Sequence, residues 1–291
     1  TSMWEYDFFK NKIFNKNFYD IEVNFILYDN NTKINKKDGH NIIVTNSVIK
    51  LNILEDMIKI LKPFAIFHLS DEYCRNIKYY DLYHKYNIKV LFHQYNSEKI
   101  DYKIKHFQIP LGYVSGFLLD NFDINQDIVN KYNFSKKYDF CFVGSLKNDR
   151  IEMLDKFKNS FKNNLIHTGL TNWTNPMNQN IKPNQLFNLY KESLFVPIGR
   201  GNISLDCFRL YEAIAARSIP VICGDIKEIN VTFKFNNKIP NIIISGTWDK
   251  AIILCNELYN DIDKLCNIIN SNIIWLNNQI INISQKINNL L

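Results

Sequence analysis

The feature that most constrains the fold is a regular alternation of short apolar runs with longer amphipathic segments. The apolar runs of the first half are residues 22–27, 42–45, 64–69, 89–92 and 106–109. Amphipathic segments that predict helices lie near 48–61 and 76–86. Short apolar runs separated by helical patterns are typical of strands in a parallel sheet that is buried on both faces. The alternation therefore predicts an α/β fold.

The same alternation restarts after a break that follows Tyr113. Residues 119–135 have poor periodicity, and we interpret them as a crossing between two domains. Strands are then predicted at 138–143, 165–167, 194–197, 220–223 and 241–245, and helices near 150–162, 183–191 and from 248. Between 261 and 291, Ile, Leu and Trp recur at helical spacing. This tail predicts one or two amphipathic helices, which suit core packing better than a coiled-coil dimer.

A chain of 291 residues exceeds one ordinary domain, so two domains are the natural expectation. We expect a Rossmann-like N-terminal domain over 1–130 and a second Rossmann-like domain over 131–270. A C-terminal helix over 271–291 would pack back on the body. Ligands of such sheets bind beyond the carboxyl ends of the strands. The loops that follow the predicted strands are therefore the candidate sites.

Composition excludes several classes of function. The net charge of +6 comes from dispersed lysines, which favours a solvated basic surface over nucleic-acid binding. The apolar runs are far shorter than the roughly 20 residues of a membrane span. Six cysteines without a C-x-x-C pattern indicate neither a zinc site nor a disulfide framework. We expect a soluble protein of a reducing compartment such as the cytoplasm, or the soluble catalytic part of a longer protein.

The most informative segment for function is residues 199–222, which predict a loop, a helix and a buried strand. Only five of the 35 basic residues are arginines, and three of these lie here: Arg200, Arg209 and Arg217. Lysine is the default cation of this chain, so arginine marks positions where a planar fork is needed. Gly199 and Gly201 flank Arg200 and let the backbone approach a ligand closely. Arg200 could therefore grip a diphosphate with two parallel hydrogen bonds.

The helix of this segment is expected to begin at Ser204, a good N-cap, with Asp206 in its first turn. Free N–H groups at such a terminus suit a phosphate. Arg209 and Glu212 are three residues apart and share one helix face. Glu212 could accept both hydroxyls of a ribose, with Arg209 beside it on the phosphate. Spacing alone fits a structural Arg–Glu pair equally well.

These residues resemble the exostosin-like glycosyltransferases. The resemblance rests on Gly199-Arg200, on Asp-Cys-Phe-Arg-Leu-Tyr-Glu-Ala at 206–213 and on Ile-Pro-Val-Ile at 219–222. The stretch 138–145, which ends in Gly144-Ser145, resembles the strand and loop that open the nucleotide-sugar domain of that family. Residues 68–72 and 109–113 look like motifs of exostosin-like proteins from protists and large DNA viruses. The chain departs from the family pattern at Cys207, where the family often has serine.

The resemblance implies a GT-B fold, in which two Rossmann-like domains face each other, and inverting transfer from a nucleotide sugar, usually linked to UDP. The acceptor would be a glycan or glycoconjugate hydroxyl bound by the N-terminal domain. No cofactor or metal is expected, because the one Asp-x-Asp triplet, Asp261 to Asp263, lies in the helical tail. The implied donor-binding residues are Gly144, Ser145, Gly199, Arg200, Ser204, Asp206, Arg209 and Glu212.

An inverting enzyme also needs a base that takes the proton of the acceptor hydroxyl. Asp71 and Glu72 follow the strand 64–69, where such a base should project, although a carboxylate there could equally cap the next helix. His68, His93 and Tyr113 are candidate acceptor contacts, and a lone histidine in such a place is more often a packed residue. Two alternatives stay open: another GT-B transferase that uses GDP-fucose, and a non-catalytic module that binds nucleotide sugars or glycans.

Overall fold

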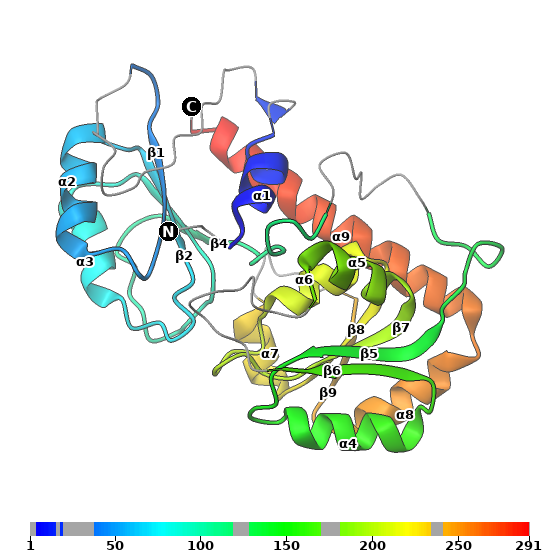
Figure 1. Ribbon diagram of the computed structural model, residues 1–291. Coiled ribbons are helices and arrows are strands. Elements are labelled where there is room, and N and C mark those ends of the chain that lie inside the picture. The colour runs from blue at the N-terminus through cyan, green and yellow to red at the C-terminus, as the bar shows by residue number, and fades with distance from the viewer. Residues whose placement is uncertain are drawn as a thin grey trace.

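A computed structural model describes residues 4–15, 18–19, 38–118, 128–169, 181–233 and 241–290. Within these residues the chain forms two parallel sheets, one with four strands and one with five (Figure 1). The predicted α/β class is confirmed, and the arrangement is consistent with a Rossmann-like two-domain fold. The expected strand at 22–27 lies outside the described residues.

The first sheet buries both of its faces. Its strands lie in the order β1 (Ile42–Asn46), β2 (Ala65–Leu69), β3 (Val90–His93) and β4 (His106–Gln108). Ile66 and Leu91 share one hydrophobic cluster with buried residues of α2 (Leu51–Leu61) and α3 (Ile77–Lys85). Phe67 and Phe92 face the other side, because side chains alternate along a strand.

The N-terminal segment covers that second face. It consists of α1 (Tyr6–Phe8) and a π-helix, η1 (Phe9–Ile13). The ring of Phe9 meets the ring of Phe67 edge-on, with centroids 5.6 Å apart. Phe67 in turn stacks on Phe92 at 4.4 Å. Aromatic packing therefore fixes the N-terminal segment against the sheet.

The second sheet has the strand order β6-β5-β7-β8-β9. Its strands are β5 (Tyr138–Gly144), β6 (Asn164–Thr168), β7 (Ser193–Ile198), β8 (Ile219–Cys223) and β9 (Ile243–Ser245). β6 pairs with one edge of β5, and β7 pairs with the opposite edge of β5. The strand order therefore reverses between β5 and β7, and the carboxyl ends at such a switch point are where open α/β sheets bind ligands.

Helices cover both faces of this sheet (Figure 1). They are α4 (Arg150–Ser160), α5 (Pro183–Lys191), α6 (Phe208–Ala215), α7 (Ile226–Thr232) and α8 (Trp248–Tyr259). Helix α6 begins at Phe208, after Cys207 in the N-cap position. The prediction that Ser204 caps this helix and that Asp206 lies in its first turn is therefore wrong. The Ser204 hydroxyl instead accepts a hydrogen bond from the Asp206 N–H at 3.0 Å within the preceding loop.

A single long helix, α9 (Ile262–Asn288), follows α8 and passes through the expected boundary at residue 270. It runs along the second sheet and ends beside the N-terminal segment (Figure 1). Its Ser284 hydroxyl donates to the carbonyl of Ile13 at 3.1 Å, and the Asn288 amide donates to Phe18 at 2.7 Å. The helix therefore contacts both parts of the molecule.

The carboxyl ends of the two sheets face each other. The loop after β3 contacts α7, where the Asn96 amide donates to the Val231 carbonyl at 3.1 Å. At the end of β4, the Gln108 amide donates to the Thr232 carbonyl at 2.7 Å. Because α7 follows the carboxyl end of β8, these bonds bring the carboxyl ends of strands from both sheets to one interface.

All six cysteines carry free thiols, and all except Cys74 are buried. None of the helices in the described ranges is long and apolar enough to cross a bilayer.

Candidate functional site

Arg209 lies at the switch point of the second sheet. Its side chain extends from α6 to the end of β5, where Nε donates to the carbonyl of Val143 at 2.8 Å. A Cβ atom added at Gly144 would overlap the guanidinium group. Glycine at this position therefore lets the arginine lie directly against the strand end.

A second arginine and a lysine lie beside it. Arg150, at the start of α4, is 2% exposed and donates from Nη1 to the carbonyl of Ser145 at 3.0 Å. The close approach of β7 to Arg150 requires Gly199, where a Cβ atom would overlap the arginine side chain. Lys147 donates from Nζ to Oδ1 of Asn202 at 2.7 Å. We refer to Lys147, Arg150 and Arg209 as the cation cluster.

The electrostatics of the cation cluster favour an anionic ligand. Burial lowers the pKa of Arg150 to about 10, and the charge of Arg209 adds to this effect. Neither arginine forms an ion pair with a carboxylate in the part of the chain that the structure describes, and Nε of Arg150 is buried without a partner there. Buried cations are normally compensated by an opposite charge. A ligand with negative charge would supply it.

Glu212 lies on the same helix as Arg209 and is 3% exposed. Its Oε1 accepts a hydrogen bond from the N–H of Val114 at 3.3 Å. Burial raises the pKa of Glu212 to about 7, and the charge of Arg209 opposes this rise. The carboxyl group lies near the cation cluster, accepts the N–H of Val114 and has the capacity to accept further hydrogen bonds.

Arg200 is paired within the protein. Its guanidinium group forms a two-pronged ion pair with Glu228 of α7, with Nη2 to Oε2 at 2.7 Å. Its backbone N–H donates to Oδ1 of Asp149 at 2.9 Å. The guanidinium group that the sequence predicted to bind a diphosphate therefore binds the carboxylate of Glu228 instead.

Asp206 is packed beneath the loop. It is fully buried, and Oδ1 accepts a hydrogen bond from the hydroxyl of Tyr211 at 2.8 Å. Burial raises the pKa of Asp206 well above its usual range. Oδ2 is buried without a hydrogen-bond partner in the described residues, so the carboxyl group is bound within the protein through Tyr211.

The two candidate bases have different surroundings. Asp71 accepts hydrogen bonds from the N–H groups of Arg75 at 3.2 Å and Asn76 at 3.3 Å, and from the hydroxyl of Tyr80 at 3.1 Å. These N–H groups precede α3, whose N-cap Asn76 has no side-chain cap bond, so Asp71 fastens the turn before the helix and does not cap α3 itself. Glu72 reaches in the other direction and binds residues 202–204 of the second domain.

The three candidate acceptor contacts are buried. His68 is bonded through Nδ1 to the hydroxyl of Tyr83 at 2.6 Å, and burial lowers the pKa of His68 to about 3. His93 pairs with His106 at 3.1 Å, and burial lowers the pKa of His93 to about 4. Tyr113 is 2% exposed. All three side chains are therefore almost fully shielded from solvent.

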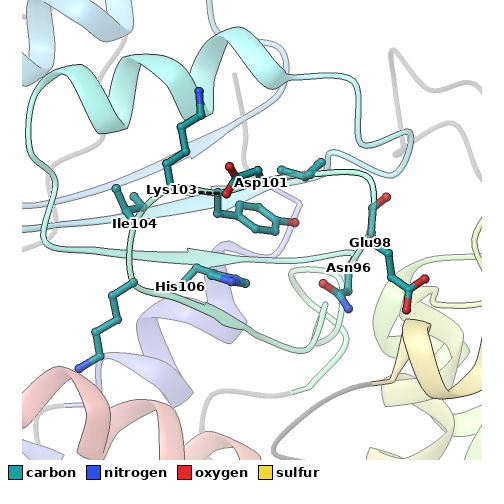
Figure 2. Close-up of a pocket in the computed structure, with 10 residues that line it drawn as sticks. Asn96, Glu98, Asp101, Lys103, Ile104 and His106 are labelled. Atoms are coloured by element: carbon teal, nitrogen blue, oxygen red, sulfur yellow. Dashed lines mark hydrogen bonds between the residues drawn. The ribbon is translucent and has the colours of Figure 1, made fainter.

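A hollow of about 540 Å³ lies on the connection between β3 and β4 (Figure 2). It is lined by that connection alone, and the labelled residues are Asn96, Glu98, Asp101, Lys103, Ile104 and His106. The dashed line marks the N–H of Lys103 donating to Asp101. Of the predicted acceptor contacts, His93 touches this lining, through His106 and Tyr102.

The structure thus brings together one part of the predicted site. Gly144, Ser145, Gly199 and Arg209 meet at the switch point, with Glu212 close by. Sequence reasoning missed Lys147 and Arg150. The scarcity of arginine was a usable signal for Arg150, because it is one of five in the chain and opens a predicted helix directly after the Gly144-Ser145 loop.

Within the described ranges, no group of three or more His, Cys, Asp or Glu side chains is arranged to hold a metal ion. No model of a known protein family matches the chain, and a search of curated proteins finds no match either.

Proposed function

We propose that this chain is an inverting, metal-independent glycosyltransferase of the GT-B type that binds the diphosphate of a nucleotide sugar, UDP-linked, at the cation cluster. The observation that carries this proposal is the pair of arginines, Arg150 and Arg209, at the switch point of the second sheet. Both donate to backbone carbonyls there, and neither forms a salt bridge with a carboxylate in the described residues.

The chemistry of the cation cluster suits a leaving diphosphate. Guanidinium groups match phosphate oxygens with paired hydrogen bonds, and Lys147 adds a third positive charge. Such preorganised charges stabilise the negative charge that develops on a leaving group. Glu212, one turn along the helix from Arg209, would accept the hydroxyls of the ribose. Residues of this chain would therefore fulfil the role that a divalent ion plays on a diphosphate elsewhere.

The transfer step is supported by two further observations. Residues 199–222 resemble the nucleotide-sugar segment of exostosin-like glycosyltransferases, from the Gly-Arg pair to the Pro-Val pair. The carboxyl ends of both sheets also meet at one interface, as a donor and an acceptor on opposite domains would require. The acceptor would be a glycan or glycoconjugate hydroxyl on the side of the first sheet.

Calorimetry with UDP, UMP and GDP tests the donor site. We expect UDP to bind more tightly than UMP, because the second phosphate adds charge at the cation cluster. Arg209→Ala should weaken UDP binding by at least about tenfold, which corresponds to about 1.4 kcal/mol and is less than a charged hydrogen bond contributes. Tighter binding of GDP than UDP would favour a GDP-fucose donor.

The matched control is Lys250→Ala, which removes an exposed cation of α8 far along the sequence from the cluster. It should change UDP affinity by less than about twofold, within the range of a screened surface charge. Equal UDP affinity in Arg209→Ala and in the unchanged protein would refute the assignment of the cation cluster.

A non-catalytic nucleotide-sugar module is the second candidate, and one observation favours it. Both candidate bases are engaged: Asp71 accepts three hydrogen bonds, and Glu72 lies in the loop beside Lys147. An inverting base must lie across the sugar ring from the leaving group, whereas Glu72 lies on the side of the cations. Binding of UDP without hydrolysis or transfer from any UDP-sugar would identify the protein as this module.

A further inference from the structure

Residues 202–204 form an anion nest. The backbone N–H groups of Asn202, Ile203 and Ser204 all point at one oxygen, Oε1 of Glu72, at 2.5, 2.9 and 3.1 Å. The side-chain amide of Asn202 donates to the other oxygen, Oε2, at 2.7 Å. Successive N–H groups that converge in this way bind anions, and phosphate groups are frequent occupants of such concavities. We refer to these three N–H groups as the 202–204 nest.

The nest adjoins the cation cluster. Lys147 bonds to the side chain of Asn202 at 2.7 Å, and the Asn148 amide donates to the carbonyl of Gly201 at 2.9 Å. The loop after β5 and the loop after β7 are therefore fastened together. A Cβ atom at Gly201 would overlap Oε1 of Glu72, so the glycine provides the space in which the carboxylate lies.

We propose that the 202–204 nest is a phosphate subsite that Glu72 fills when no ligand is bound, so that Glu72 and a ligand phosphate compete for it. The identity of the ligand as a nucleotide diphosphate rests on the function proposed above. All three N–H groups of the nest donate to one oxygen, Oε1 of Glu72, so a ligand oxygen would take these donors only when Glu72 leaves. A phosphate brings more negative charge than a carboxylate, and Lys147 lies beside the nest, so we expect a ligand phosphate to displace Glu72.

This competition couples ligand binding to the interface of the two sheets. Glu72 follows β2, 130 residues before Asn202 in the chain, so its hydrogen bonds tie the first domain to the second. A phosphate that enters the nest breaks this tie and releases Glu72. Breaking the hydrogen bonds of Glu72 costs free energy, which offsets part of the free energy of ligand binding. The apparent affinity of the protein for the ligand is therefore reduced.

Calorimetry with inorganic pyrophosphate and with UDP tests the proposal on the full chain. Glu72→Gln removes the charge that competes for the nest, so we expect pyrophosphate to bind at least about tenfold more tightly. In Glu72→Gln the amide oxygen could still occupy the nest. Glu72→Ala leaves no side-chain group to do so, and it should also tighten pyrophosphate binding. Glu98→Gln removes an exposed charge of the first domain and should change the affinity by less than about twofold.

Unchanged or weaker pyrophosphate binding in both Glu72 variants would overturn the proposal, as would the absence of pyrophosphate binding in every variant. The nucleotide function is judged separately. If pyrophosphate tightens in the Glu72 variants but UDP binds no better than pyrophosphate, the subsite is supported and the nucleotide assignment fails. If UDP binding depends on Arg209 but is indifferent to Glu72, the function is supported and the competition is overturned.

Discussion

At the scale of single residues, Glu5 is a buried carboxyl group that accepts a hydrogen bond from a neutral amide. Glu5 is 1% exposed, and its Oε1 accepts a hydrogen bond from the amide of Gln94 at 3.2 Å. Gln94 in turn accepts the N–H of Ser70 at 2.8 Å. Burial raises the pKa of Glu5 to about 7. The protonated form therefore predominates in the folded protein below about pH 7.

We predict that Glu5→Gln stabilises the protein at alkaline pH. Because the folded pKa of Glu5 lies above its ordinary value of 4.5, its contribution to stability is fully present below pH 4.5 and is lost as the pH rises through 7. At pH 8 the neutral glutamine should raise the free energy of unfolding by up to about 3 kcal/mol, and this gain should shrink towards pH 5. Urea unfolding at both pH values measures it.

The control for Glu5 is Glu257→Gln, which changes an exposed carboxyl group of α8. Its effect should stay within about 0.5 kcal/mol at both pH values. A Glu5→Gln variant that is no more stable than the unchanged protein at pH 8 would show that the carboxylate is compensated in the folded state.

The sequence motifs identified those site residues whose position follows from local spacing. Gly144, Gly199, Arg209 and Glu212 belong to short segments that the sequence singled out. Local spacing could not predict the contacts of Glu5 and Glu72. Glu5 contacts Gln94, 89 residues away, and Glu72 contacts Asn202, 130 residues away. No local pattern encodes which loop a side chain meets across an interface.

At the scale of elements, strands were predicted to within a residue or two wherever buried runs alternate with helices. For β5, the prediction of 138–143 compares with Tyr138–Gly144. The predicted start of α6 was wrong because the Ser204 hydroxyl accepts the N–H of Asp206 inside a loop, and Glu72, which follows β2 of the first sheet, accepts the N–H of Ser204. Capping residues favour turns as strongly as helix starts, so tertiary contacts decide between the two.

We predict that Gly144→Ala disturbs the approach of α6 to β5. The added Cβ atom would overlap the guanidinium group of Arg209, so the arginine must leave the strand end. Overpacking of this kind costs about 1–3 kcal/mol, and UDP binding should weaken together with stability. The matched control is Gly246→Ala, where a Cβ atom would meet nothing within 4 Å. Equal stability of the two variants would show that Arg209 is not held against Gly144.

At the scale of the whole molecule, the hydrophobic core is continuous across both sheets. One cluster of buried side chains includes Phe67 and Phe92 of the first sheet, Phe140 and Phe195 of the second, and Ile283 of α9. The sequence pattern predicted two sheets and an amphipathic tail. It could not show that α9 reaches the first sheet, because an apolar face does not specify the surface that it covers.

We therefore predict a single cooperative unfolding transition in which α9 takes part. Ile283→Ala removes a side chain that is 4% exposed, and it should lower the free energy of unfolding by about 2–5 kcal/mol. Ile281→Ala, on the same helix but 38% exposed, should cost less than about 1 kcal/mol. Far-UV circular dichroism and tryptophan fluorescence should report the same midpoint in urea for each variant. Two separate transitions, of which Ile283→Ala shifts only one, would show that the sheets unfold independently and that α9 belongs to one of them alone.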